Sequence, residues 1–172
     1  MVASLHKTHE FKDIKAVKCK VSDILEANPD PRFTISDLLW SSHQARTERN
    51  RLKGNGFRHN IVDVNGVANT LTSRYGKDGR ENLILQPGKN PRMFTPRECA
   101  RLMGFKDSFI LPETKTPAYR QLGNSVCVPI IEELALQVNA HILEALEEAV
   151  EYGTDNTPLV YANATQAVPL AG

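Results

Sequence analysis

Residues 95–105 read TPRECARLMGF, a stretch in which both ends of a short helix are specified by local chemistry. Thr95 is suited to cap the helix, and Pro96 takes the first helical position, where no backbone amide is required. Glu98, three residues after the cap, completes a capping box, and Gly104 ends the helix after about two turns. The stretch therefore predicts a short helix with a fixed start.

A second marked segment, QLGNSVCVP, covers residues 121–129 and leads into a long helix. Its glycine frees the backbone before Asn124 and Ser125, whose side chains either bind a small ligand or form a turn and cap before Pro129. From about Pro129 to Tyr152, apolar residues recur with helical spacing, and glutamates cover the other side. The apolar positions are 130, 131, 134, 138, 142, 145, 146 and 149. We predict one long amphipathic helix.

The chain before residue 95 shows one helix followed by short β-prone runs. Thr34 or Ser36 can cap a helix that continues to Arg51 and ends at Gly54. Asn-Gly, Asp-Gly and Pro-Gly-Lys-Asn segments, which are typical of hairpin turns, separate the β-prone runs. These runs are residues 57–64, 69–75, 81–86 and 92–94, and residues 16–21 alternate like one further short strand. We predict a small antiparallel meander with flanking helices.

Charge is distributed unevenly although the net charge is only +1. Residues 42–106 carry 13 Lys and Arg against 5 Asp and Glu, whereas residues 107–172 carry 2 against 9. A basic middle segment suits a polyanion, because Lys and Arg contacts to phosphates supply sequence-independent affinity. Charge alone also fits an ordinary solvated face.

The composition points away from metal sites, disulfides and membranes. Cys19, Cys99 and Cys127 are odd in number and lack any CxxC spacing, so we expect neither a disulfide framework nor a zinc site, in a reducing cytosol. Cys99 and Cys127 are expected to be buried small apolar residues. The five histidines show no metal-ligand spacing. No apolar run approaches the roughly 18 residues of a membrane span, and the start MVASLHKTHEF has no apolar signal core. We expect a cytoplasmic protein.

Residues 53–58, KGNGFR, form the second candidate for a functional loop. Two glycines around Asn55 give a pliable tip that can approach another backbone closely. Arg58 can then reach guanine O6 and N7 in a major groove as a bidentate donor. A Gly-x-Gly segment by itself is most often only a loop.

Together, TPRECARLMGF and QLGNSVCVP resemble the last two motifs of DNA cytosine-5 methyltransferases, in the right order and near the carboxyl end. SDILEANPDPRFTISDLLW and ANTLTSRYGKDG resemble the target-recognition region of bacterial members. The resemblance runs from about residue 22 to about residue 150. It implies an α+β fold: a small β-rich recognition domain and a long C-terminal helix that docks on a Rossmann-like catalytic partner.

The resemblance also implies a role for individual residues. Asn55 matches the position that fills the space of the extruded cytosine, and Arg58 a position that reads guanine. The expected DNA-recognition set is Asn55, Arg58, Lys53, Thr70, Leu71, Thr72 and Arg74. The residues expected to organise the recognition domain are Arg97, Glu98 and Arg101. The residues expected to border S-adenosylmethionine are Asn124, Ser125 and Val126. The expected docking surface for the partner comprises Ile130, Leu134, Val138 and Leu146.

The sequence departs from the family pattern in one large respect. It contains no glycine-rich cofactor loop, no Pro-Cys-Gln nucleophile, and neither the Glu-Asn-Val nor the Gln-x-Arg-x-Arg segment. We therefore expect no catalytic residue in this chain. A catalytic polypeptide carries the Pro-Cys-Gln motif and binds most of the S-adenosylmethionine, and double-stranded DNA is the other partner. The alternatives are a stand-alone DNA-binding module and an inactive methyltransferase fragment.

These expectations divide the chain into four parts. They are a leader with a short strand at 1–21, a target-recognition domain at 22–106, a cofactor-bordering loop with the docking helix at 107–152, and a disordered tail at 153–172. The whole is predicted to serve as the small subunit of a split bacterial modification methyltransferase, a heterodimer in a restriction–modification system.

Overall fold

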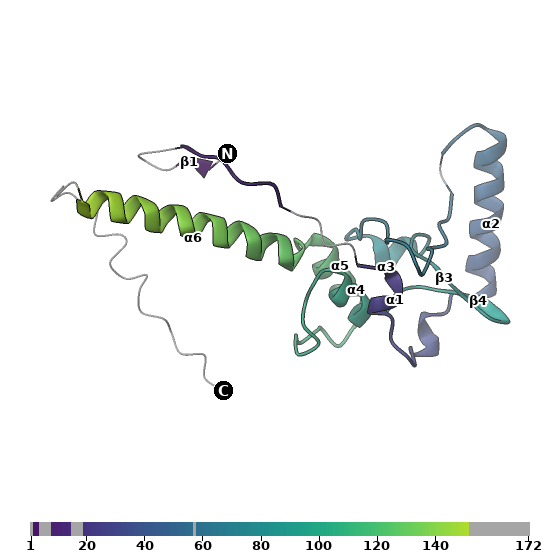
Figure 1. Cartoon of the computed structure of the whole chain (residues 1–172). Helices are drawn as coiled ribbons and strands as arrows, with labels where there is room; N and C mark the ends of the chain where they lie inside the picture. Colours follow the sequence, from purple (N-terminus) through teal and green to yellow (C-terminus); the bar gives the residue numbers. More distant parts are fainter. Residues whose placement is uncertain (1, 4–7, 15–18, 57, 152–172) are drawn as a thin grey trace. The chain divides into compact units, whose positions relative to one another are not determined.

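The computed structural model describes residues 2–3, 8–14, 19–56 and 58–151. It separates into two units (Figure 1). The body is Ile14–Ile131, and the terminal unit joins Met1–Asp13 to Glu132–Gly172. The body contains α1 (Val21–Ile24), the 3-10 turn η1 (Pro31–Phe33), α2 (Asp37–Leu52), α3 (Tyr75–Asp78), β3 (Ile84–Gln86), β4 (Lys89–Arg92), α4 (Pro96–Leu102) and α5 (Lys115–Asn124). The last helix, α6 (Val128–Glu151), begins in the body and continues in the terminal unit.

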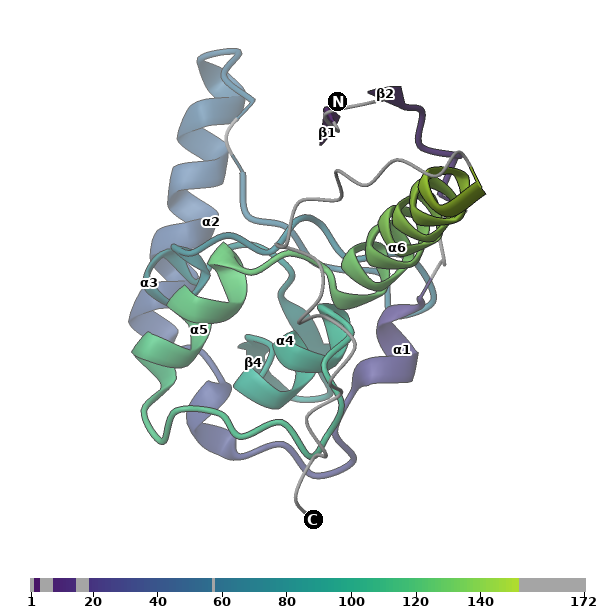
Figure 2. The ribbon, with the colours of Figure 1, turned by 90° about the vertical axis from the view of Figure 1, so that its left-hand side faces the viewer.

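The core of the body forms around α4, which lies between α5 and α1 (Figure 2). Phe94 precedes α4 and is fully buried between two tyrosines. The Phe94 amide donates to the Tyr75 hydroxyl at 2.7 Å, and the Tyr119 hydroxyl donates to the Phe94 carbonyl at 2.6 Å. The rings of Tyr75 and Tyr119 meet edge to face. α3, α4 and α5 are therefore joined by apolar burial and by satisfied polar groups.

Gly123 allows the closest approach in this core. A side chain at Gly123 would overlap the backbone of Thr72 and Ser73. The glycine lets α5 lie directly on the segment that precedes α3. The same glycine belongs to the QLGNSVCVP segment, so that segment has a packing role whatever else it does.

The predicted helix boundaries in the body are confirmed. Ser36, rather than Thr34, caps α2 and accepts from the Leu39 amide, and Gly54 follows the helix with φ +69°. Thr95 and Glu98 form the predicted capping box of α4. Gly104 then takes φ +82°, as a residue that ends a helix does.

The predicted meander is wrong, since among the described residues of the body only β3 and β4 pair as strands. The turn predicted over residues 87–90 forms at Pro87-Gly88 alone, since Lys89 and Asn90 already belong to β4, and β4 ends at Arg92 rather than covering 92–94. Asn65-Gly66 instead closes a local turn whose amides bond to Asp63. Asp78-Gly79 ends α3 with Gly79 in the left-handed region, because the backbone that suits a hairpin also suits a helix cap.

The β-prone runs 57–64 and 69–75 are consequently not strands in their described residues. The first makes one isolated parallel bridge, Ile61 to Leu83, and the second runs into α3. The strand expected over 16–21 is also wrong at its described end. Val21 begins α1, because the Lys20 amide is capped by the Asp23 carboxylate at 3.1 Å; residues 15–18 lie outside the described residues.

The terminal unit contains two short strands and most of α6. β1 (Val2–Ala3) pairs antiparallel with β2 (Thr8–His9), inside the expected leader. The Gln137 side chain binds the backbone of Lys12 twice. Gln137 Oε1 accepts from the Lys12 amide at 2.9 Å, and Gln137 Nε2 donates to the Lys12 carbonyl at 3.3 Å. The predicted long helix is confirmed as far as Glu151; Gly153 and the tail expected over 153–172 lie outside the described residues.

One described helical stretch, within 115–147, is long and apolar enough by length and composition to cross a membrane. The sequence-based expectation that no such stretch exists is corrected here. A single stretch of this kind is weak evidence for a membrane span, because helices of soluble proteins pass the same test.

Candidate DNA-recognition site

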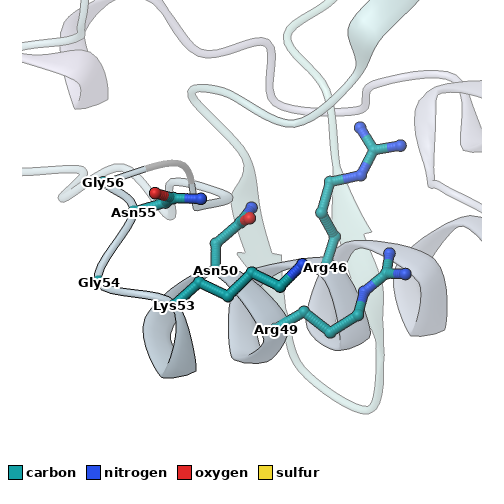
Figure 3. A pocket seen from close by; sticks show the side chains of 7 residues that line it. All are labelled: Arg46, Arg49, Asn50, Lys53, Gly54, Asn55 and Gly56. Carbon is teal, nitrogen blue, oxygen red and sulfur yellow. The ribbon is translucent and has the colours of Figure 1, made fainter.

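The end of α2 presents a polar tip with a fixed backbone. The Lys53 amide donates to the Arg49 carbonyl at 3.2 Å, and the Asn55 amide donates to the Asn50 carbonyl at 2.8 Å. Between them, Gly54 adopts φ +69°, a conformation that side chains with a Cβ rarely take. The KGNG segment is therefore a continuation of the helix end, and Asn55 is held close to the last turns of α2 (Figure 3).

An open depression of about 710 Å³ lies beside this tip. Its lining comprises Arg46, Arg49, Asn50, Lys53, Gly54, Asn55 and Gly56. In Figure 3 the Asn55 amide lies beside Asn50, the side chains of Arg49 and Lys53 extend along α2, and Arg46 points away from the helix. The lining contains three cations, two amides and no carboxylate, so it is suited to an anionic ligand with hydrogen-bonding edges.

Arg58 follows the tip and is exposed, but it does not line the depression. The next residue is anchored on α2: the Thr47 hydroxyl accepts from the His59 amide at 3.1 Å and lies 2.8 Å from His59 Nδ1. The His59 ring also meets the edge of Trp40, with centroids 4.8 Å apart. Sequence reasoning missed this anchor, because Thr47 and His59 are far apart along the chain.

The other predicted DNA-recognition residues divide by burial. Leu71 is a core residue with 7% exposure, whereas Thr70 and Thr72 are exposed. Arg74 is exposed and paired with Asp78 at 3.3 Å, which lowers the pKa of that carboxyl through the Arg74 hydrogen bond. None of the four lines the depression.

A buried asparagine positions this second segment and was not predicted from the sequence. Asn82 is fully buried with φ +51°. Its side chain accepts from the Asn69 amide at 2.8 Å and donates to the Asn69 carbonyl at 3.0 Å. The Asn82 side chain therefore satisfies both backbone groups of Asn69, the residue just before Thr70. Asn tolerates the left-handed region better than most residues, so the residue type alone could have indicated a turn at this position.

Glu98 is the most heavily bonded of the three residues expected to organise the domain. It has no exposed surface and accepts from both Arg92 terminal nitrogens, at 2.7 and 2.8 Å. It also accepts from the backbone amides of Glu26 and Thr95, at 2.9 and 2.8 Å. One carboxylate thus joins the segment after α1 to β4 and to the start of α4. The partner Arg92 was not predicted.

The two other residues of this set bond around α4. Arg101 makes two 2.8 Å bonds to Asp107 and a third, at 3.1 Å, to the Ile24 carbonyl. Asp107 consequently has a lowered pKa, caused first by the Arg101 hydrogen bond. Arg97 donates to the Phe109 carbonyl at 2.9 Å. Both arginines hold the 104–114 loop next to α4.

Asn124, Ser125 and Val126 lie where α5 ends. Asn124 is exposed, and Val126 is 58% exposed. The Ser125 hydroxyl donates to the Leu122 carbonyl at 2.7 Å, which caps the end of α5. These residues form one edge on the surface of the body. Such an edge can border a ligand but does not enclose one.

The four predicted docking residues belong to α6, which crosses from the body into the terminal unit. Ile130 is 43% exposed in the body. In the terminal unit, Leu134, Val138 and Leu146 are half-buried. Leu136 and Leu143 are more exposed than these three. Of the four docking residues, three are therefore half-buried, whereas Ile130 is exposed.

Burial affects the chemistry of two of the three cysteines. Cys99 is fully buried, and burial raises the pKa of its thiol well above the ordinary value. Burial also raises the pKa of Cys19. The part of the chain that the structure describes contains no cluster of His, Cys, Asp or Glu suited to a metal ion. The arrangement can bind and position a ligand.

Comparison with known proteins defines the class of protein. Residues 3–140 match the family model of the C-5 cytosine-specific DNA methylases, and the chain belongs to this family. It is 54% identical over 121 residues to the type II methyltransferase M.NlaX of Neisseria lactamica, covering 70% of this chain and 39% of that protein. It is 45% identical over 134 residues to M.SsoII of Shigella sonnei, covering 77% and 35%. The chain therefore spans between a third and two fifths of these relatives.

Solved structures show the same fold at lower identity. The Dnmt2 methyltransferase of S. pombe superimposes with a TM-score of 0.56 at 22% identity, over 73% of this chain and 41% of that one. The methyltransferase EhMeth of Entamoeba histolytica gives 0.55 at 22% identity, over 81% and 46%. The resemblance to this family inferred from the two end motifs is thus confirmed.

Proposed function

We propose that this chain is the DNA-recognition part of a DNA cytosine-5 methyltransferase, and that a separate polypeptide supplies the catalytic cysteine. The observation that carries the proposal is the polar tip at the end of α2. There Asn55 and three cations surround one open depression in a chain of this family. The names of the bacterial relatives support type II modification, and we place the protein in a restriction–modification system of a bacterial cytosol.

The proposed division of work follows from the chemistry of base flipping. A cytosine must leave the stack before its C5 can be methylated, which costs a few kcal/mol of unstacking and unpairing. Groups that fill the vacated space offset this cost. Asn55, held by its own backbone at the helix end, is the group we assign to that space. Arg58 is assigned to guanine, and Lys53, Thr70, Thr72 and Arg74 to the surrounding duplex, while Leu71 supports them from the core.

The residues at the end of α5 fit the border of the cofactor site. S-adenosylmethionine supplies the methyl group when it is bound. Asn124 offers an exposed amide and Val126 an exposed apolar surface, while Ser125 holds the turn between them. We assign these three residues to one wall of that site. The catalytic polypeptide supplies the remaining walls.

The apolar stripe of α6 is the proposed docking surface for the catalytic polypeptide. Leu134→Asp with Val138→Asp puts two charges on the stripe, and we expect the variant to lose co-purification and methylation while its far-ultraviolet circular dichroism stays unchanged. Asn139→Asp with Ala140→Asp adds two charges at exposed positions off the stripe and should retain both properties. If the stripe variant unfolds while the wild-type chain is a well-behaved monomer, the docking assignment is wrong.

Two substitutions test the recognition assignment. Arg58→Ala should reduce discrimination at one guanine by about 1–3 kcal/mol if the contact is bidentate. Lys53→Gln should instead weaken binding to all duplexes alike. The measurement is the affinity of the purified assembly for duplexes that differ at single base pairs. If both variants lose affinity equally for all duplexes, Arg58 contacts a phosphate and does not read guanine.

The two alternatives give different results in simple assays. A stand-alone binding module shifts a specific duplex in a gel without any catalytic polypeptide. An inactive fragment binds no sequence preferentially and rescues no catalytic polypeptide. The proposed subunit gives sequence-dependent methylation only in the presence of its partner.

A further inference from the structure

We propose that one face of α2 is a binding site for the phosphate backbone of duplex DNA. The site is made by Arg46, Arg49, Asn50 and Lys53. It rests on the proposed function, and it extends that function from the loop residues to a helix that no motif marks. Its role is to fix the position of the Asn55 tip on the duplex without reading sequence.

The spacing of these four residues places them on one side of the helix. Offsets of 3, 4 and 7 residues fall on neighbouring turns of a 3.6-residue helix. The carboxylates of α2, Asp37 and Glu48, are offset by about half a turn from Arg46 and therefore lie on the other side. Glu48 is bound there by Arg51, at 2.7 Å. The cations of the proposed site thus share a face from which the acids of the helix are absent.

The helix dipole explains only part of this arrangement. Cations in the last turn stabilise a helix by interacting with its carbonyl end, and Arg49 and Arg51 meet that description. Arg46 lies a turn earlier and Lys53 just after the helix, so the dipole does not account for their alignment with Arg49. An external anion in the depression contacts all three cations together.

The dimensions fit a polyanion better than a small molecule. Residues 46 to 53 cover about 10 Å of helix axis, and one DNA strand advances about 3.4 Å per phosphate, so the three cations match about three phosphates. The depression is open rather than enclosed (Figure 3). Small ligands are usually held in closed, largely apolar cavities.

The site is also coupled to the recognition tip by short bonds. The Asn50 and Arg49 carbonyls, on the same helix face, accept from the Asn55 and Lys53 amides. One turn earlier on α2, the Thr47 hydroxyl holds His59, the residue that follows Arg58. A duplex held on this face of α2 therefore has a fixed position relative to both Asn55 and Arg58.

The experiment compares two triple variants with the same change in net charge. The site variant is Arg46→Gln, Arg49→Gln, Lys53→Gln. The control is Arg51→Gln, Lys89→Gln, Lys106→Gln. It removes three exposed cations that lie outside the proposed site, of which Arg51 pairs with Glu48. Affinity of the full chain for a mixed-sequence duplex of about 20 base pairs is measured by fluorescence anisotropy between 50 and 200 mM salt. Circular dichroism checks the fold of each variant.

We expect the slope of log affinity against log salt to become shallower by about 3 in the site variant and by less than 1 in the control. Over this fourfold range of salt, three lost contacts correspond to about a 40-fold smaller fall in affinity. Equal slopes in the two variants, or no salt-dependent binding by the wild-type chain, overturn the proposal. Equal or tighter binding to a single strand of the same length overturns the assignment to duplex DNA.

A selection from random duplexes separates this proposal from the proposed function. If the wild-type assembly selects no sequence while the slopes differ as expected, the phosphate site stands and sequence recognition is wrong. If it selects a sequence and the slopes are equal, recognition stands and the phosphate site is wrong.

Discussion

Replacing Glu98 by Ala tests whether the buried ion pair holds the body together. The substitution leaves Arg92, which is only 4% exposed, without its carboxylate partner. Removing one member of a buried pair costs about 3–5 kcal/mol, because the remaining charge is uncompensated in a poorly polarisable surrounding. The backbone amides of Glu26 and Thr95 lose their acceptor as well. We therefore expect a loss near the upper end of this range.

Urea unfolding followed by circular dichroism measures the effect. With a slope near 2 kcal/mol per molar urea, a loss of about 3–5 kcal/mol lowers the midpoint by about 1.5–2.5 M. Glu113→Ala, an exposed position, should change stability by no more than about 0.5 kcal/mol. Glu98→Leu with Arg92→Met should be less damaging than Glu98→Ala, because no charge stays buried. A loss below about 1 kcal/mol for Glu98→Ala refutes the reasoning.

Two further predictions concern packing and pH. Gly123→Ala should lower the free energy of unfolding by about 1–3 kcal/mol in urea, because the added methyl group meets the backbone of Thr72. Gly56→Ala, with open space around it, should be nearly neutral, and equal effects of the two substitutions contradict the close approach. His43 is buried, and desolvation lowers its pKa below the ordinary value of 6.5 despite the 2.9 Å contact with the Gly79 carbonyl. Because the unfolded chain then binds the proton more readily, the free energy of unfolding should fall as pH drops below about 6.5. His43→Gln should flatten that fall between about pH 7 and pH 5. A variant whose stability depends on pH as the wild type's does contradicts this role of His43.

The elements that sequence reasoning predicted well are those specified by neighbouring residues. The α4 capping box needs only Thr95, Pro96 and Glu98, and it forms as expected. The same holds for the Ser36 cap of α2 and for the periodic apolar residues of α6. Local hydrogen bonds and helical periodicity are both visible within one turn of sequence.

The failures occur where distant residues decide the structure. Asp78-Gly79 fits a hairpin turn and a helix cap equally well, and packing of α3 on α5 selects the cap. Residues 60–62 bond to residues 80–83, and this pairing replaces the predicted hairpin ladder. The partner of Glu98 and the anchor of His59 are likewise set by the fold, so neither has a local sequence signal.

The most direct test of the central claim is methyl transfer by complementation. The catalytic polypeptide is M.NlaX from which the region matched by this chain has been deleted, since the two proteins are 54% identical in that region. Each polypeptide is incubated alone and in mixture with duplex DNA and labelled S-adenosylmethionine. We predict label at cytosine C5 only in the mixture, at a reproducible sequence. Methylation by this chain alone, or none in a mixture that co-purifies, contradicts the account.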